Sequence, residues 1–105
     1  MKLTDLIPYL KQPDKWEDLL AYLGIDTNCE EVLIYAHDKL DINSDILLIE
    51  VEKTEDDLEI ILEGKKYVQI LPYSLAYELI TIDFGNFKTH LEIAQRLIEY
   101  SINDA

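Results

Sequence analysis

Residues 46–71 read ILLIEVEKTEDDLEIILEGKKYVQIL, and this stretch decides the fold. It holds three apolar runs, at about 46–53, 58–63 and 66–71, in which hydrophobic residues alternate with charged or polar ones. A period of two is typical of strands that bury one face. The polar segment 54–57 separates the first two runs, and Gly64-Lys65 separates the last two. Gly at the first position of a two-residue loop suits a type II′ hairpin turn.

Both connections agree on one register for a three-stranded antiparallel meander. The second turn pairs Leu62 with Tyr67 and Ile60 with Gln69, and the first pairs Ile49 with Leu62. The meander then has one apolar face, which we expect to meet the core. The alternative is a helix that begins at Thr54, ends at Gly64 and buries Leu58, Ile61 and Leu62.

Helical patterns flank the meander on both sides. Asp14 and Glu17 have capping-box spacing and predict a helix at 14–23 that Gly24 ends. Thr27 and Glu30 repeat the spacing and predict a helix at 28–40, although the apolar cluster at 32–35 is equally compatible with a buried strand. Residues 3–11 predict a short helical turn whose upstream extent Pro8 limits.

The C-terminal part predicts two more helices. Leu75 and Leu79 share one face of a helix at 73–83, which Gly85 breaks. Thr89 and Glu92 have capping-box spacing for a helix at 88–102, whose apolar stripe begins at Phe87 and continues through Leu91, Ala94, Ile98 and Ile102. The sequence therefore predicts one α+β domain over residues 1–105, a three-stranded antiparallel β-meander packed with about four α-helices.

The chain is strongly acidic, with 22 acidic and nine basic residues and a net charge of −13. Residues 26–63 hold 13 acidic residues and two lysines, so nearly all the excess lies in the middle of the chain. Direct binding to nucleic acid or to an anionic membrane is disfavoured, because both require positive charge on the protein. The first residues lack the apolar run of a signal peptide, and we expect a cytoplasmic protein.

The sequence contains partial matches to known sites, and each match fails at a key position. Asp41, Asn43, Asp45 and Glu52 have the spacing of an EF-hand calcium loop, but Ile46 stands where the loop needs Gly. Glu63-Gly64-Lys65 is similar to part of a nuclease motif, but its Gly lies at a predicted turn in a negative field.

The isolated polar and aromatic residues predict no catalytic site. His37 and His90 have no metal-ligand spacing, and Cys29 is expected to be a half-buried structural thiol. Tyr73 and Tyr77, with Trp16 and Tyr67, belong either to the core or to an interface. We therefore predict no catalytic residues, no cofactor and no metal, and the sequence defines no oligomeric state.

The predicted outer face of the meander is the candidate functional surface. It carries Glu50, Glu52, Glu59 and Glu63 among Leu48, Ile61, Val68 and Ile70, with Glu52 directly opposite Glu59 and Lys66 opposite Glu63. Carboxylates around an apolar patch favour a basic protein partner. Acidity that serves only solubility is the alternative, and a C-terminal helix over this face would move the carboxylates to its edge.

The function that we expect is a non-enzymatic protein-binding module, in one version an inhibitor or immunity-type protein that masks the basic active site of a nuclease. The expected partner-binding residues are Asp45, Glu50, Glu52, Glu59 and Glu63. Two alternatives stay open. One is a small metal-binding protein or metal-dependent enzyme that uses the Asp41-Asn43-Asp45-Glu52 cluster, and the other is a structural subunit.

Overall fold

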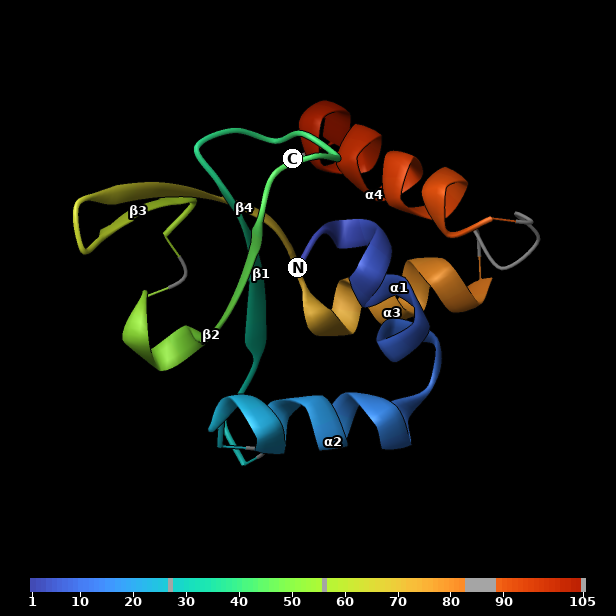
Figure 1. The fold of residues 1–105 in the computed structure, drawn as a ribbon, viewed down its shortest axis with the longest axis horizontal. Helices are drawn as coiled ribbons and strands as arrows, with labels where there is room; N and C mark the ends of the chain where they lie inside the picture. Colours follow the sequence, from blue (N-terminus) through green and yellow to red (C-terminus); the bar gives the residue numbers. More distant parts are fainter. Residues whose placement is uncertain (27, 56, 83–88, 105) are drawn as a thin grey trace.

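A computed structural model describes residues 1–26, 28–55, 57–82 and 89–104 (Figure 1). The predicted cap at Thr27, the break at Gly85 and the start of the apolar stripe at Phe87 lie outside these residues. In the described ranges the helices and strands follow in the order α1 (Leu3–Lys11), α2 (Pro13–Leu23), β1 (Val32–His37), β2 (Ile46–Glu50), the short 3-10 helix η1 (Val51–Lys53), β3 (Glu59–Leu62), β4 (Lys65–Pro72), α3 (Tyr73–Ile82) and α4 (His90–Asp104).

The strands form an antiparallel sheet in the order β2-β1-β4-β3, so the fold class α+β is confirmed and the three-stranded meander is wrong. β2 pairs with β1 rather than with β3, and β2 and β3 lie at opposite edges. The segment 51–53, predicted to extend the first strand, forms η1. The missing strand is β1, which lies within the predicted helix at 28–40.

β1 is a strand because both of its faces are buried. Val32, Ile34 and Ala36 pack against the helices, while Leu33 and Tyr35 on the other face are 1% and 0% exposed. A strand buried on both sides reads as a continuous apolar run, and its periodicity alone does not separate it from a helix.

The β3–β4 hairpin is present, but its register differs from the predicted one by two residues. Leu62 pairs with Lys65 and Ile60 with Tyr67, so the two-residue loop is Glu63-Gly64 rather than Gly64-Lys65. Glu63 and Gly64 have φ values of 51° and 79°, as a type I′ turn requires, which replaces the predicted type II′ turn. A shift of two residues changes partners but keeps the paired side chains of residues 59–62 and 65–68 on their predicted faces.

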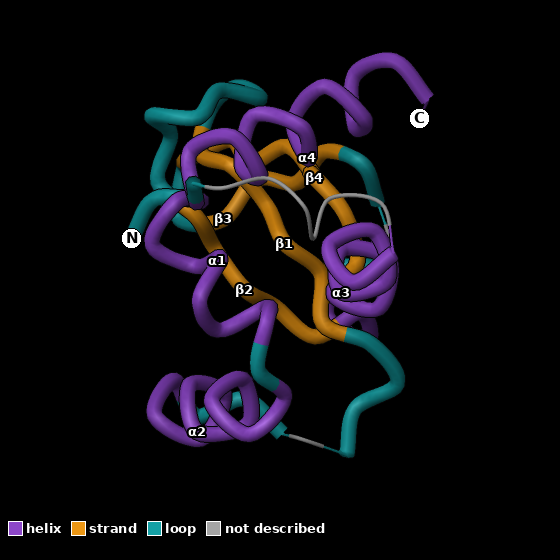
Figure 2. Tube along the Cα trace, turned by 90° about the vertical axis from the view of Figure 1, so that its right-hand side faces the viewer, coloured by secondary structure: helices purple, strands orange, loops and turns teal. Residues whose placement is uncertain are grey.

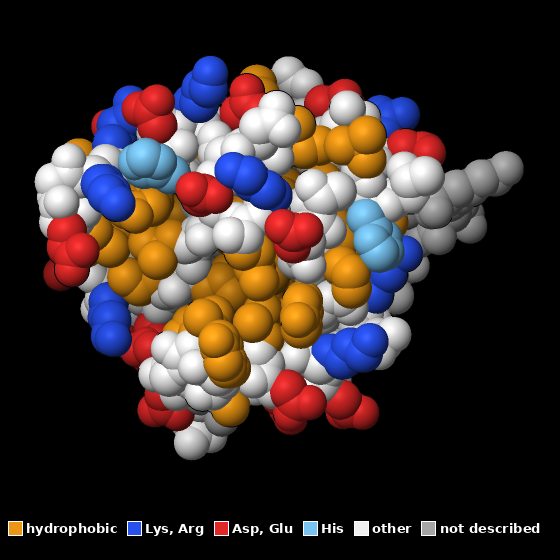
Figure 3. All heavy atoms as spheres, viewed as in Figure 1, with side chains coloured by type: hydrophobic (Ala, Val, Ile, Leu, Met, Phe, Trp, Pro, Cys, Tyr) orange, Lys and Arg blue, Asp and Glu red, His pale blue; other side chains and the backbone are white. Residues whose placement is uncertain are grey.

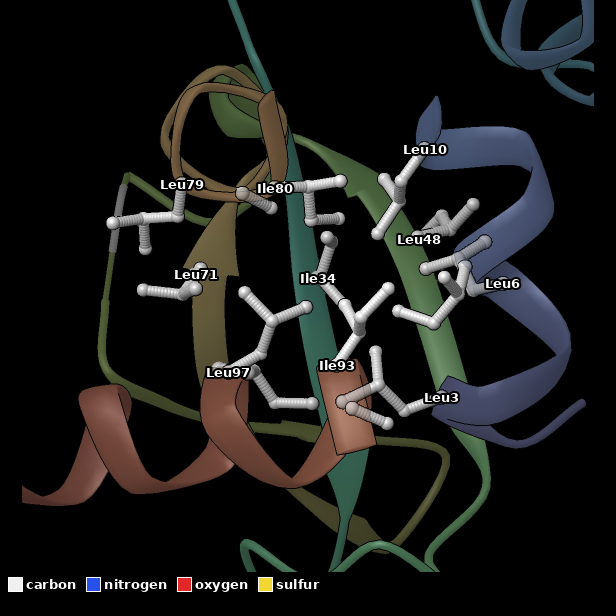
Figure 4. Packing of buried hydrophobic residues seen from close by; sticks show 14 of the residues in the cluster. Leu3, Leu6, Leu10, Ile34, Leu48, Leu71, Leu79, Ile80, Ile93 and Leu97 are labelled. Carbon is white, nitrogen blue, oxygen red and sulfur yellow. The ribbon is translucent and has the colours of Figure 1, made fainter. Parts of the chain in front are cut away.

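The helices cover the face of the sheet that was predicted to be the outer one. Figure 2 looks onto this side, where α1, α3 and α4 lie against the strands and α2 lies beyond one end. Leu48 of β2 packs with Leu6 and Leu10 of α1, and Ile34 and Leu71 meet Ile93 and Leu97 of α4 (Figure 4). The core is therefore on the opposite side from the predicted one, and Glu50 and Glu59 share a sheet face with it.

The connection from β2 to β3 covers the other face of the sheet. The Tyr35 hydroxyl donates a hydrogen bond to the Asp57 carbonyl oxygen, and Thr54 in the same connection is buried. This packing accounts for the burial of Leu33 and Tyr35 and brings the acidic residues after β2 towards β3.

The local signals for the other helices are mostly confirmed. α2 and α3 match the predicted 14–23 and 73–83 closely, and Gly24 ends α2 in the left-handed conformation. α4 begins beside the predicted capping box, in which the Glu92 N–H donates to Thr89 Oγ1 at 3.1 Å. α1 is a full helix rather than a short turn, since it runs through Pro8 and buries a stripe made of Leu3, Leu6, Ile7 and Leu10.

Candidate functional site

Asp45, the first predicted partner-binding residue, is engaged within the molecule. Its carboxylate lies 2.9 Å from Lys2 Nζ and 4.0 Å from the N-terminal amine, just before β2. The hydrogen bond from Lys2 holds the pKa of Asp45 below its ordinary value, and the charge of Lys2 acts in the same direction. Asp45 therefore holds the N-terminal residues against the start of β2. It lies apart from the other predicted partner-binding residues.

Glu50 also differs from the expected free carboxylate. It ends β2, its side chain is only 15% exposed, and its carboxylate lies 3.6 Å from Lys53 Nζ. Burial raises the pKa of the nearby Cys29 thiol, and the charges of Glu52, Glu50 and Asp26 raise it further. Cys29 is half-buried, as the sequence predicted, so this end of β2 is a packed region.

Glu52 and Glu59 do not pair across neighbouring strands, since Glu52 lies in η1 and Glu59 opens β3 on the far edge of the sheet. The structure nevertheless brings them to one shallow depression of about 390 Å³ between η1 and β3. Glu55 and Asp57 line the same depression. Glu63 lies apart, exposed in the β3–β4 turn.

Glu55 and Asp57 were missed because the polar segment 54–57 predicts only a turn. Their signal in the sequence was the acidic run itself, which follows Glu52 and precedes Glu59. The predicted contact between Lys66 and Glu63 is also replaced, because Lys66 pairs with Ile61.

Hydrophobic side chains are exposed beside these carboxylates. Ile61 is 64% exposed and Leu62 is 37% exposed, and both line the depression. Leu58, just before β3, is 71% exposed. Figure 3 shows hydrophobic side chains gathered between β3 and β2, with charged side chains at the margin. We call the group Glu52, Glu55, Asp57, Glu59, Ile61 and Leu62 the acidic edge.

The EF-hand-like residues do not assemble into one site. Asp41 Oδ1 accepts a hydrogen bond from the Asn43 N–H at 2.8 Å, and Asp45 is paired with Lys2. Glu52 lies beyond the other end of β2. Within the described ranges, no three His, Cys, Asp or Glu side chains are grouped so that they could hold a metal ion.

The four aromatic residues considered as core or interface residues lie in two separate regions of the structure. Trp16 and Tyr73 stack with ring centroids 4.2 Å apart, Tyr77 lies 6.0 Å from Tyr73, and Tyr67 instead packs 5.4 Å from His37. Burial raises the pKa of Tyr73, with smaller contributions from Tyr77, Glu17 and Glu31. Trp16 is only 4% exposed, so the stack between α2 and α3 is mainly part of the core.

A second hollow, of about 540 Å³, lies between β4 and the C-terminal half of α4. Its lining is largely apolar and includes Val68, Ile70, Leu75 and Ile102. It contains none of the acidic residues that the sequence singled out.

Comparison of the chain with protein-family models, with curated proteins and with solved structures finds no match. No helix in the described part of the chain has the length and apolar character needed to cross a membrane.

Proposed function

We propose that this chain is a non-enzymatic protein-binding module whose acidic edge receives a basic protein. The observation that carries the proposal is the grouping of four carboxylates, from Glu52, Glu55, Asp57 and Glu59, around one depression that also exposes Ile61 and Leu62. The carboxylates attract and orient a positively charged partner, and the apolar side chains supply area whose burial stabilises the complex. An inhibitor that covers the basic active site of a nuclease is one partner arrangement of this kind.

The acidic edge supports this function better than the surface expected from the sequence. Asp45 and Glu50 are tied to Lys2 and Lys53, and a partner would compete with those ion pairs. The metal-binding alternative is weaker still, because Asp45 is paired with Lys2 and Glu52 is separated from Asp41 by the length of β2. We place the partner-binding residues at Glu52, Glu55, Asp57 and Glu59, with Glu63 at the margin.

The test is the triple substitution Glu52→Gln, Glu55→Gln and Glu59→Gln. With a basic partner recovered at low salt and purified, the association rate should fall by about tenfold or more at low ionic strength, because steering by charge acts mainly on association. The difference between variant and native protein should shrink in 0.5 M salt, since screening then shortens the range of the charges to a few Å.

The matched control removes three charges elsewhere, through Glu17→Gln, Asp18→Asn and Glu78→Gln on α2 and α3. All three side chains are exposed, and the net charge changes by the same amount. If both triple variants slow association equally, only the overall charge matters and the acidic edge has no special role. If neither does, the acidity serves solubility alone.

A further inference from the structure

We propose that the free edge of β3 binds an extended basic segment of the partner as an added β-strand. This inference rests on the proposed function and specifies how the partner would be held. It is argued from the hydrogen-bonding groups of β3, its exposed side chains and the charges beside it.

The backbone of β3 has unused hydrogen-bonding groups on one side. The Gln69 N–H donates to the Leu58 carbonyl at 2.8 Å, and the pairs Ile60–Tyr67 and Leu62–Lys65 follow in the same phase. In an antiparallel ladder, alternate residues point their N–H and C=O groups to the same neighbour. Glu59 and Ile61 therefore direct their N–H and C=O groups away from β4, and among the described residues β3 pairs with β4 alone.

The two edges of the sheet differ in how they are covered. At β2 the Ile46 N–H donates to the Met1 carbonyl at 2.8 Å, and Lys2 bridges to Asp45. The N-terminal residues thus occupy part of that edge. β3 has no such cover in the described ranges, and it lacks the Pro, Lys or bulge that commonly protects an edge strand. Its Ile61 and Leu62 are exposed instead.

Charge selects the kind of strand that fits this edge. Residues 50–66 hold seven acidic residues and three lysines, and the depression beside β3 is lined by four carboxylates and by Lys53. Lys65 and Lys66 belong to β4, on the other side of β3. Glu59 and Ile61 lie on one face of β3, and Ile60 and Leu62 lie on the other. A strand with alternating basic and apolar residues would therefore place its basic groups beside Glu59 and its apolar groups beside Ile60 and Leu62. A second copy of this chain is a poor occupant, because each copy carries a net charge of −13.

The direct test uses two ten-residue peptides with blocked ends, Arg-Val repeated five times and the same peptide with every backbone amide N-methylated. The charges are equal, but the second peptide has no N–H group on either side of the strand and cannot donate to a ladder. We expect the Arg-Val peptide to bind about tenfold more tightly or better, with weaker binding at high salt. Its binding should slow hydrogen exchange at the Glu59 and Ile61 amides. Equal affinity for both peptides, or unchanged exchange at these two amides, would overturn the proposal.

Variants of Ile61 separate strand addition from attraction by charge. Ile61→Pro removes an outward N–H and spares the ladder with β4, whereas Ile61→Thr keeps the N–H and reduces the apolar surface. We expect Ile61→Pro to abolish the preference for the Arg-Val peptide and Ile61→Thr to retain it. If only the triple Gln variant loses binding, the proposed function stands and strand addition is wrong.

Light scattering of the free protein tests whether a second copy of this chain binds the edge of β3 instead. Protection of the Glu59 and Ile61 amides in a dimer that Ile61→Pro dissociates would assign the edge to a second copy and overturn the basic partner. A monomer throughout the concentration range of the peptide experiments supports the assignment to a partner.

Discussion

At the scale of single residues, Glu31 connects two elements that are distant in the sequence. Its carboxylate accepts hydrogen bonds from the Val32 N–H and the Ser74 N–H, both at 3.2 Å, and from the Ser74 hydroxyl. It therefore satisfies a backbone donor in the first turn of α3, as a capping side chain does.

We predict that Glu31→Ala lowers the free energy of unfolding by about 0.5–2 kcal/mol, the range for loss of a helix cap. Denaturant titration measures the change. Glu30→Ala is the matched control, because Glu30 is an exposed neighbour with the same charge, and it should change stability by less than about 0.5 kcal/mol. Equal effects of the two substitutions would show that charge rather than the cap is responsible.

Cys29 reports on the negative field at the end of β2. Burial is the largest cause of its raised pKa, followed by Glu52, Glu50 and Asp26. Because the thiolate is the reactive form, the rate of disulfide exchange with an aromatic disulfide should reach its half-maximum at a higher pH than for an unhindered cysteine. Glu52→Gln should lower that pH, and Glu63→Gln should leave it unchanged. No shift with Glu52→Gln would place this carboxylate too far away to act on Cys29.

At the scale of elements, the sequence predicted the parts with local signals and failed where long-range pairing decided. α2 and α4 could be located from Gly24 and from the Thr89–Glu92 capping box. The strand that pairs with β2 could not be predicted, because the alternating pattern of β2 suits pairing with β1 and with β3 equally well. Residues 32–37 form a strand only because both of their faces are buried in the folded chain.

The candidate site was predicted only in part, because local sequence signals locate some of its residues and long-range packing decides the others. The sequence indicated an acidic surface near residues 50–63 that includes Glu52 and Glu59, and the structure places both at one depression. It did not indicate Glu55 and Asp57, because their position depends on how the connection folds over Tyr35. Leu48 and Ile70 were expected outside, but no local pattern reveals which face of the sheet the helices cover.

The β3–β4 turn offers an element-level test in two directions. Glu63 has φ 51°, which a non-glycine residue other than Asn or Asp adopts at a cost, and Gly64 has φ 79° with open space where a Cβ atom would lie. Glu63→Asn should raise the free energy of unfolding by a few tenths of a kcal/mol or more, because Asn-Gly suits a type I′ turn. Gly64→Ala should lower it by about 1 kcal/mol, through backbone strain alone. Changes in the same direction would contradict the observed turn.

At the scale of the whole molecule, the charge is unbalanced in a way that local contacts do not relieve. The described ion pairs include Lys2–Asp45, Lys39–Asp41, Lys53–Glu50 and Arg96–Glu99. All of these except Lys53–Glu50 are largely exposed, and exposed pairs contribute little. The carboxylates of the acidic edge lie within eight residues of the sequence, and the fold holds them around one depression. Like charges at short range destabilise the compact state, so the folded protein should gain more from screening than the expanded chain does.

We therefore predict that the melting temperature rises as sodium chloride is raised from 10 mM to 0.3 M. A gain of about 1 kcal/mol would correspond to a rise of roughly 4–8 °C for a domain of this size. Screening depends on ionic strength and not on the identity of a monovalent salt, so potassium chloride at the same concentration should give the same rise.

The triple variant Glu52→Gln, Glu55→Gln and Glu59→Gln should respond less, because three of the repelling charges are gone. The control triple on α2 and α3 should respond more than that variant, since the local cluster is intact. A melting temperature that is independent of salt, or equal responses in the two variants, would show that the acidic edge carries no significant repulsion in the folded state.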